Sequence, residues 1–453
     1  MRLLVSCIPY DKGKSGISEY IREVVRELAA QGHELTLLCE PEARKEAECK
    51  VESVKCKIEY APRWTRRPAF SMLWHLFLLP FWVRRHRREF DGFVVCAANR
   101  RVCAWYPLPT TATVHDLANF HIPGKYSRAR MFYLAHVLPF FAKRAQRLVA
   151  VSGATKADMV KFWHCRDEDV TVLYNGLRTS DLGLQATSSA GLQAAPGSGL
   201  RTSDLGLQAT SSAGLQATPG LGLRTSDLGL QATSSAGLQA TLGSGLRTSD
   251  LGLQKNSRRK NPEVGSPKSE VSALLYISRI EHPGKNHVRL IEAYSRLPRD
   301  LAEAHPLVIA GADWKDAEAV HEAAAKSPYS DLIRFTGFVP AADIEGLWSQ
   351  TGFYVFPSLF EGFGLSLIEA MARGVPCACS NNGSLGEIAG DAAITFDPES
   401  VEAIADALVR LVSEPEPERE ARIARGLEWV KRFSWADHAA GLSKLIKEVK
   451  SKT

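Results

Sequence analysis

The chain has 453 residues, of which 45% are hydrophobic and 23% charged, enough for two or three domains with ordinary cores. A net charge of +6 does not by itself indicate a nucleic-acid-binding protein, and no apolar run reaches the ~18 residues of a membrane span. The nine cysteines are scattered and odd in number. Reduced core thiols of a cytoplasmic protein explain them better than disulfides or a metal site.

The first residues predict alternating strands and helices. "RLLVSCI" is typical of a buried strand, and "SEYIREVVRELAAQGH" of an amphipathic helix. Its apolar face contains Ile21, Val24, Val25 and Leu28, and Gly32 marks its end. "ELTLLCE" predicts the next strand. The opening strand is too short for a secretory signal peptide.

The loop "KGKSG" lies between the first predicted strand and the first predicted helix. A P-loop would need a glycine at position 8, which is Ile8, so that motif is absent. Gly13 and Gly16 still place backbone N–H groups near a helix N-terminus, where an anion or a closely approaching sugar can bind. A simple tight turn is the alternative.

Residues 63–88 contain seven arginines, no acidic residue and a central apolar run. This pattern is typical of a helix that lies on an anionic membrane surface with its basic ends among the headgroups. The alternative is a buried domain helix with solvated ends.

His115, in "TATVHDLANFH", directly follows a β-branched strand. The carboxyl ends of parallel strands face the ligand crevice of a doubly wound sheet. We therefore expect its ring near a substrate hydroxyl or a developing positive charge, with a structural histidine as the alternative.

Residues 178–254 are a tandem repeat of "RTSDLGLQATSSAGLQA" plus a joint, with a period of 23 residues. The unit has few leucines, no aromatic residue and much Gly, Ser, Thr and Ala, so it buries too little apolar surface to offset the entropy of ordering. We expect a flexible insertion, followed by a polar linker. A small solenoid or an interaction arm are the alternatives.

The second half repeats the pattern of the first. "SALLYIS" predicts a strand, "HVRLIEAYSRLP" a helix and "HPLVIAGA" another strand, so two doubly wound parallel sheets should face each other across a cleft. Arg279 and Lys285 lie on the loop after the first of these strands. Two cations near a helix start can neutralise a diphosphate, although such a pair is often only surface charge.

The stretch "FYVFPSLFEGFGLSLIEAMARG" predicts a strand, a glycine loop and a helix. Glu361 lies on the loop, and Gly362, Phe363 and Gly364 offer backbone N–H groups at the helix start. Glu369 lies on the helix among apolar residues, where a carboxylate needs hydrogen-bonding partners such as sugar hydroxyls.

Outside the repeats, the chain resembles the family 4 glycosyltransferases, which have the GT-B fold. The most specific part is "FPSLFEGFGLSLIEAMARGVPCACSNNGSLGEIAGDAA", supported by "TVHDL", "VSGATKADMV", "VTVLYNGL", "LLYISRIEHPGKN" and "FTGFV". The sequence departs from the family pattern at Gly284 and Gly386. The resemblance implies an α/β chain of two facing Rossmann-like domains, a repeat insertion and a last helix that crosses back. The expected boundaries are 1–176, 177–268, 269–435 and 436–453.

The resemblance also implies roles for single residues. Gly16 would lie near the donor phosphates and His115 near the transferred sugar. Arg279 and Lys285 would bind the diphosphate, Glu361 the sugar and Glu369 the ribose. The catalytic set would be His115, Glu361, Arg279 and Lys285. The rest of the donor site would be Gly13, Gly337, Phe338, Val339, Gly362, Phe363, Gly364 and Leu365. No metal or other cofactor is implied.

The sequence therefore predicts a retaining hexosyltransferase that uses a nucleotide-diphosphate sugar, with GDP-mannose favoured. The expected acceptor is a lipid-linked saccharide or a polysaccharide in O-antigen-like cell-surface synthesis. We expect the protein at the inner face of the cytoplasmic membrane and not on nucleic acid. The alternatives are a glucan synthase, a sugar-nucleotide epimerase or a non-catalytic scaffold that uses the repeats, and the oligomeric state stays open.

Overall fold

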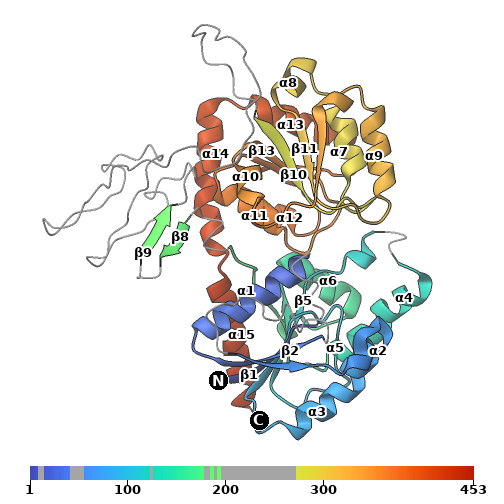
Figure 1. Ribbon diagram of the computed structural model, residues 1–453, viewed down its shortest axis with the longest axis vertical. Coiled ribbons are helices and arrows are strands. Elements are labelled where there is room, and N and C mark those ends of the chain that lie inside the picture. The colour runs from blue at the N-terminus through green and yellow to red at the C-terminus, as the bar shows by residue number, and fades with distance from the viewer. Residues whose placement is uncertain are drawn as a thin grey trace, which may run out of the picture.

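A computed structural model describes residues 1–8, 15–40, 56–122, 126–177, 184–187, 191–194 and 272–452. Two α/β domains lie one above the other, and the last two helices, α14 and α15, run along one side of both (Figure 1). The predicted pair of doubly wound domains is thereby confirmed.

The first domain has a parallel sheet of seven strands in the order β3-β2-β1-β4-β5-β6-β7. The order reverses between β1 and β4, so the loops after these two strands lie at the topological switch point. The strands are β1 (Arg2–Ser6), β2 (Glu34–Cys39), β3 (Cys56–Tyr60), β4 (Gly92–Val95), β5 (Thr110–Val114), β6 (Arg147–Ala150) and β7 (Val170–Val172).

The second domain repeats this topology with six parallel strands in the order β12-β11-β10-β13-β14-β15. Its switch point lies between β10 and β13, whose loops carry Lys285 and Glu361. The strands are β10 (Ala273–Ile277), β11 (Leu307–Ala310), β12 (Ile333–Gly337), β13 (Thr351–Phe356), β14 (Cys377–Ser380) and β15 (Ala393–Phe396).

Helices cover both faces of each sheet. In the first domain they are α1 (Gly16–Ala30), α2 (Pro68–Leu73), α3 (Leu79–Arg85), α4 (Arg128–Phe132), α5 (Leu138–Ala142) and α6 (Gly153–Trp163). In the second they are α7 (His287–Tyr294), α8 (Arg299–Ala304), α9 (Ala317–Lys326), α10 (Ile344–Trp348), α11 (Leu365–Ala372), α12 (Leu385–Ala389), α13 (Val401–Ser413) and α14 (Glu416–Trp429), followed by α15 (Trp435–Lys450). The sequence analysis did not predict α8, which separates α7 from β11.

Strand β1 shows how the sequence pattern builds two cores. Leu3 and Val5 belong to the cluster that contains the apolar face of α1, whereas Leu4 belongs to the cluster on the opposite face of the sheet. Successive side chains of a strand point to opposite faces, so a continuous apolar run is what a sheet covered on both sides requires. The predicted helix is confirmed as α1, with Ser15 as its N-cap and Gly32 just beyond its end.

Helix α15 crosses back to the first domain and packs against α1. Trp435, Ala439, Leu442 and Ile446 are buried in the contact. Burying a leucine or isoleucine side chain contributes about 1.5–3 kcal/mol, so this helix is part of the first domain's core. At its far end, Lys450 Nζ lies 2.7 Å from Asp91 Oδ1.

The segment 63–88 has one side buried in the first domain and one exposed apolar side, and its contact with a membrane stays a prediction. It forms a short 3₁₀ turn (Arg63–Arg66), α2, a π-helical turn (Trp74–Leu78) and α3. Trp74, Leu76, Leu79 and Val83 are buried in the first domain. An apolar face remains exposed on the other side and consists of Trp64, Phe70, Leu73, Phe77, Leu78 and Phe81.

Most of the predicted repeat insertion lies outside the described residues. Within the first repeat copy, β8 (Leu184–Thr187) and β9 (Gly191–Ala194) pair antiparallel. The prediction of a flexible insertion stays a prediction. Among the described residues, no helix has both the length and the apolarity needed to cross a bilayer.

Candidate active site

A cleft of about 480 Å³ separates the carboxyl ends of the two sheets. Its walls come from the start of α1, from His115 after β5, from the loop after β10 and from the loop between β13 and α11. Ten of the predicted site residues line it: Gly16, His115, Arg279, Lys285, Glu361, Gly362, Phe363, Gly364, Leu365 and Glu369.

Lys285 and Glu361 form an ion pair inside this cleft. Lys285 Nζ lies 2.6 Å from Glu361 Oε1, and the two side chains are only 20% and 17% exposed. The Tyr276 hydroxyl donates a hydrogen bond to the Lys285 backbone carbonyl at 2.9 Å, which fixes the lysine loop against β10. The pair presents a positive and a negative group at one point, so a bound anion and a bound hydroxyl can each find a partner there.

Two helix N-termini meet beside this pair. Helix α1 begins at Gly16, and α11 begins at Leu365 after Gly364, whose φ of +105° favours glycine. A Cβ placed on Gly16 would lie 3.9 Å from Leu365 Cδ1, so the two starts are in contact across the cleft. Among the described residues, no side chain caps α11. Helix N-termini favour anions through their N–H groups and dipoles.

Glu369 and Arg279 also line the cleft. Glu369 lies on α11 and is half-buried rather than fully enclosed by its apolar neighbours. Arg279 is 42% exposed, lies 3.4 Å from Glu281 and stacks over Trp314 at 5.2 Å. The arginine is therefore held near the mouth of the cleft rather than beside Lys285.

His115 is buried, and its Nε2 donates a hydrogen bond to the Cys96 backbone carbonyl at 2.7 Å. Burial lowers the pKa of His115 to about 4. The ring is therefore neutral near pH 7 and carries its proton on Nε2. Its edge contact with Tyr20, at 4.6 Å, joins it to α1.

Tyr20 links His115 to the last helix. Its hydroxyl lies 2.9 Å from Thr113 Oγ1 and 2.8 Å from His438 Nε2 on α15. The helix that crosses back thus supports the cleft as well as the core.

Four predicted donor-site residues are not found in the cleft. Gly337, Phe338 and Val339 lie at and beyond the end of the edge strand β12, and Phe338 is 60% exposed. Val339 faces a separate shallow pocket. Gly13 lies outside the described residues. Their assignment to the donor site stays a prediction.

Glu387 makes an interdomain contact that the sequence analysis passed over. Its carboxylate accepts hydrogen bonds from the backbone N–H groups of Gly153 and Ala154, at 2.8 and 3.0 Å, and from the Tyr174 hydroxyl at 2.7 Å. Because Glu387 belongs to the second domain and its three donors to the first, these contacts form an interdomain clasp. The signal was present in "SLGEIAG", where only Gly386 was considered.

Four buried histidines predict that the fold is sensitive to acid. Burial lowers the pKa of His75, His115 and His438 from 6.5 to about 4, and that of His287 to about 3. Below pH 6.5 the unfolded chain takes up protons that the folded chain does not. The free energy of unfolding is expected to fall between about pH 6.5 and 4, by up to about 1.4 kcal/mol per pH unit for each ring. Urea denaturation from pH 8 to 4.5 checks this, and a flat profile below pH 6.5 would contradict it.

Comparison with known families agrees with this geometry. Residues 14–181 match the model described as "Glycosyltransferase Family 4", and residues 257–429 match the one described as "Glycosyl transferases group 1". The chain belongs to the glycosyltransferases. The two matches fall on the two domains, one on each side of the cleft.

Curated relatives of this glycosyltransferase share part of its length. The O-antigen chain mannosyltransferase B of Escherichia coli is 38% identical over 162 residues, which are 36% of this chain and 42% of the relative. A glycogen synthase of Mycobacterium tuberculosis is 33% identical over 165 residues, which are 35% of this chain and 38% of the relative. The chain thus spans less than half the length of these relatives.

Solved structures share the fold of the glycosyltransferase over nearly its whole length. The Anabaena protein HepE, solved in complex with UDP and glucose, is 15% identical, covers 98% of each chain and has a TM-score of 0.61. WaaG, a glycosyltransferase involved in lipopolysaccharide biosynthesis, is 14% identical, covers 97% of this chain and 98% of its own, and has a TM-score of 0.58. These likenesses confirm the GT-B fold.

Proposed function

We propose that this glycosyltransferase moves a hexose, with mannose favoured, from a nucleotide-diphosphate sugar to a lipid-linked saccharide or a polysaccharide. The observation that carries the proposal is the Lys285–Glu361 pair at the point where α1 and α11 meet. The similarity to an O-antigen chain mannosyltransferase supports mannose and cell-surface glycan synthesis. GDP-mannose is accordingly the favoured donor.

Each element of the cleft has a part in the proposed reaction. Lys285 and the N-terminus of α11 stabilise the negative charge that grows on the leaving diphosphate. Arg279 neutralises the diphosphate from the mouth of the cleft. Glu361 accepts hydrogen bonds from sugar hydroxyls, and Glu369 does the same for the ribose. In a partly buried site each hydrogen bond to a charged group contributes about 1.5–3 kcal/mol.

The proposed transfer retains the anomeric configuration. The acceptor hydroxyl oxygen forms its bond to the anomeric carbon on the face from which the diphosphate oxygen departs, and the hydroxyl proton passes to that oxygen. His115 remains neutral because of its burial, so it adds no positive charge beside a sugar that itself becomes cationic.

The test is a screen of nucleotide sugars by thermal shift, followed by transfer of labelled sugar to membrane extract. A true donor stabilises the folded protein by mass action. Glu361→Ala should lose transfer, whereas Glu322→Ala, an exposed glutamate of α9 outside the cleft, should keep it. Absence of transfer with every donor, together with wild-type donor binding by Glu361→Ala, would overturn the proposal.

A glucan synthase is the second candidate, because one relative is a glycogen synthase. The two functions differ in the acceptor. Transfer from a nucleotide glucose to soluble glucan, without any need for membrane extract, would favour the synthase.

The apolar face of residues 63–88 supports membrane binding within this proposal. Phe81 of this face also lines a shallow pocket. The other lining residues of this pocket are Arg84, Arg85, Arg87 and Arg88. Aromatic side chains next to arginines suit the boundary between acyl chains and anionic headgroups. The first domain would then hold its acceptor side against the inner face of the cytoplasmic membrane.

Flotation with vesicles tests this surface. Phe77→Ser/Phe81→Ser should reduce binding to vesicles with anionic lipid about tenfold or more, because it removes two apolar side chains from the interface. Phe338→Ser, which changes an equally exposed phenylalanine of the second domain, should bind as the wild type does. Equal binding by all three proteins would refute the membrane surface.

A further inference from the structure

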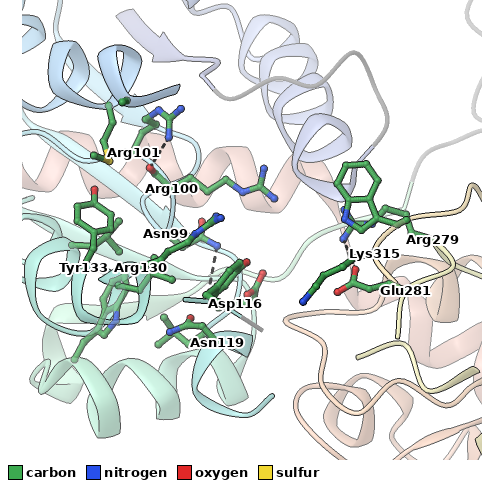
Figure 2. A pocket seen from close by; sticks show the side chains of 18 residues that line it. Asn99, Arg100, Arg101, Asp116, Asn119, Arg130, Tyr133, Arg279, Glu281 and Lys315 are labelled. Atoms are coloured by element: carbon green, nitrogen blue, oxygen red, sulfur yellow. Dashed lines mark hydrogen bonds and ion pairs between the residues drawn. The ribbon is translucent and has the colours of Figure 1, made fainter. Parts of the chain in front are cut away.

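A second cavity, of about 900 Å³, opens beside the donor cleft. The two share Arg100, Asp116, Arg279 and Glu281 in their walls, so a ligand in one can reach a ligand in the other. Figure 2 shows side chains of the first domain facing Arg279, Glu281 and Lys315 of the second domain across this space. We call it the arginine cavity.

The loop after β4 supplies its central residues. Asn99, Arg100 and Arg101 follow the carboxyl end of β4, at the switch point of the first sheet. The backbone N–H groups of Arg100 and Arg101 both donate to the Ala97 carbonyl, at 3.0 and 2.9 Å. The turn holds both guanidinium-bearing residues next to each other, and Arg100 reaches toward the gap between the domains (Figure 2).

Four buried polar atoms of this cavity have no hydrogen-bond partner among the described residues: Asn99 Oδ1, Arg101 Nε, Asn119 Nδ2 and Trp163 Nε1. Trp163 is 1% exposed and belongs to the residues that line the cavity. Leaving one such group unsatisfied costs about 1–3 kcal/mol. Three of the four are donors, so the ligand that completes them is rich in acceptors.

The charges of the cavity point to an anion. Across the described residues, no carboxylate forms an ion pair with Arg100, Arg101 or Arg130. Burial lowers the pKa of Arg101, an effect that Glu40 opposes at longer range. Of the two acidic residues in the wall, Glu281 already pairs with Arg279. An uncompensated buried cation is costly unless a ligand supplies the opposite charge.

The remaining wall suits a saccharide. Tyr126, Tyr133 and Trp314 contribute aromatic rings, and Asp116 and Asn119 contribute polar groups. Aromatic faces pack against the apolar faces of sugar rings, while the polar groups fix hydroxyls. A cavity of this size holds more than one sugar unit.

We propose that the arginine cavity is the acceptor subsite and that it binds a phosphate carried by the acceptor saccharide. Arg101 is the half-buried cation for this phosphate, Arg100 lies between acceptor and donor, and the orphaned donors of Asn119 and Trp163 complete the contact. Arginine binds phosphate through two parallel N–H donors, which gives direction as well as charge. This inference rests on the proposed function, since it names the acceptor class of the same enzyme.

The test measures binding to the full chain by calorimetry, with the donor cleft filled by the nucleoside diphosphate that stabilises the protein most. The probes are an octyl-diphosphate-linked disaccharide, an octyl disaccharide 6-phosphate and the neutral octyl disaccharide. Either phosphate probe should bind about ten to a hundred times more tightly than the neutral one. Tighter binding of the diphosphate-linked probe assigns the phosphate to the lipid linkage, and tighter binding of the 6-phosphate assigns it to the sugar ring.

Arg101→Gln should remove most of this preference, and Trp163→Phe should weaken it. Arg410→Gln, at an exposed arginine of α13, should leave it unchanged. Because Arg101 is half-buried and forms no ion pair with a carboxylate in the part of the chain that the structure describes, Arg101→Gln should unfold at the same temperature as the wild type or a higher one. A loss of the phosphate preference without a loss of thermal stability therefore distinguishes a ligand-binding role of Arg101 from a structural one.

Equal affinity for the three probes would overturn the inference, as would an unchanged preference in Arg101→Gln. Tighter binding of an octyl glucuronide than of either phosphate would overturn the choice of phosphate. None of these measurements requires sugar transfer. If the proposed function failed instead, no nucleotide sugar would stabilise the protein, while binding of the phosphate probes would persist.

Discussion

Lys285→Ala is expected to lower kcat/KM for sugar transfer by about a hundredfold to a thousandfold. The ammonium group is nearly buried beside Glu361 and faces the position of the departing diphosphate. Removing one preorganised group that stabilises developing charge typically costs a factor of this size. Initial rates with the identified donor, and donor affinity by thermal shift, provide the measurement.

The chain offers a matched control for this change. Lys326 forms an ion pair of the same 2.6 Å length with Glu322, on the exposed surface of α9. Lys326→Ala should keep full activity, because exposed pairs contribute little. If Lys285→Ala transferred sugar within threefold of the wild-type rate, the diphosphate role of this lysine would be wrong.

Gly362→Ala is expected to abolish activity without unfolding either domain. A Cβ at this position would lie 1.8 Å from the His115 carbonyl oxygen and 2.8 Å from its carbonyl carbon. These are backbone atoms of the opposite domain and cannot move aside as a flexible side chain would. The two domains must separate, which breaks the contact of the Gly362 carbonyl with the Ser152 hydroxyl at 2.8 Å.

Activity, thermal unfolding and the radius of gyration together check this prediction. Gly362→Ala should show less than about one hundredth of the wild-type rate and a larger radius, since misplacing reacting groups by about 1 Å can cost a hundredfold. Gly346→Ala is the control, because nothing lies within 4 Å of a Cβ at that site on α10. It should keep full activity and gain about 0.4–1 kcal/mol of stability. Full activity of Gly362→Ala would contradict the close approach of the domains.

The fold and the centre of the site were accessible from sequence because they depend on local patterns. Alternating apolar strands and amphipathic helices predict doubly wound sheets, and the rule that loops at strand carboxyl ends line the crevice brings His115, Lys285 and Glu361 together. In the structure these three residues line one cleft. The direct ion pair between Lys285 and Glu361 could not be predicted, because it depends on how the loops after β10 and β13 lie relative to each other in space.

Arg100 and Arg101 illustrate what sequence cannot supply. In "AANRRVCAW" they look like ordinary surface charge. Their proposed role becomes apparent only in the structure, where Tyr133 from η5 (Tyr133–Val137) and Trp163 from α6 line the same cavity. Glu387 is similar, because its three donors are distant in the chain and meet it only when the domains close. The roles of such residues can be inferred only from the residues that surround them in the folded structure.

The position of α15 has a consequence for synthesis on the ribosome. The first domain needs this helix to cover α1 and the sheet, yet residues 178–434 are translated in between. At roughly 5–20 residues per second, that interval lasts on the order of 10 to 50 s. Throughout it, the nascent first domain exposes the apolar groove that Leu442 and Ile446 later fill. The core of the first domain is thus complete only after the last residues of α15 have been translated.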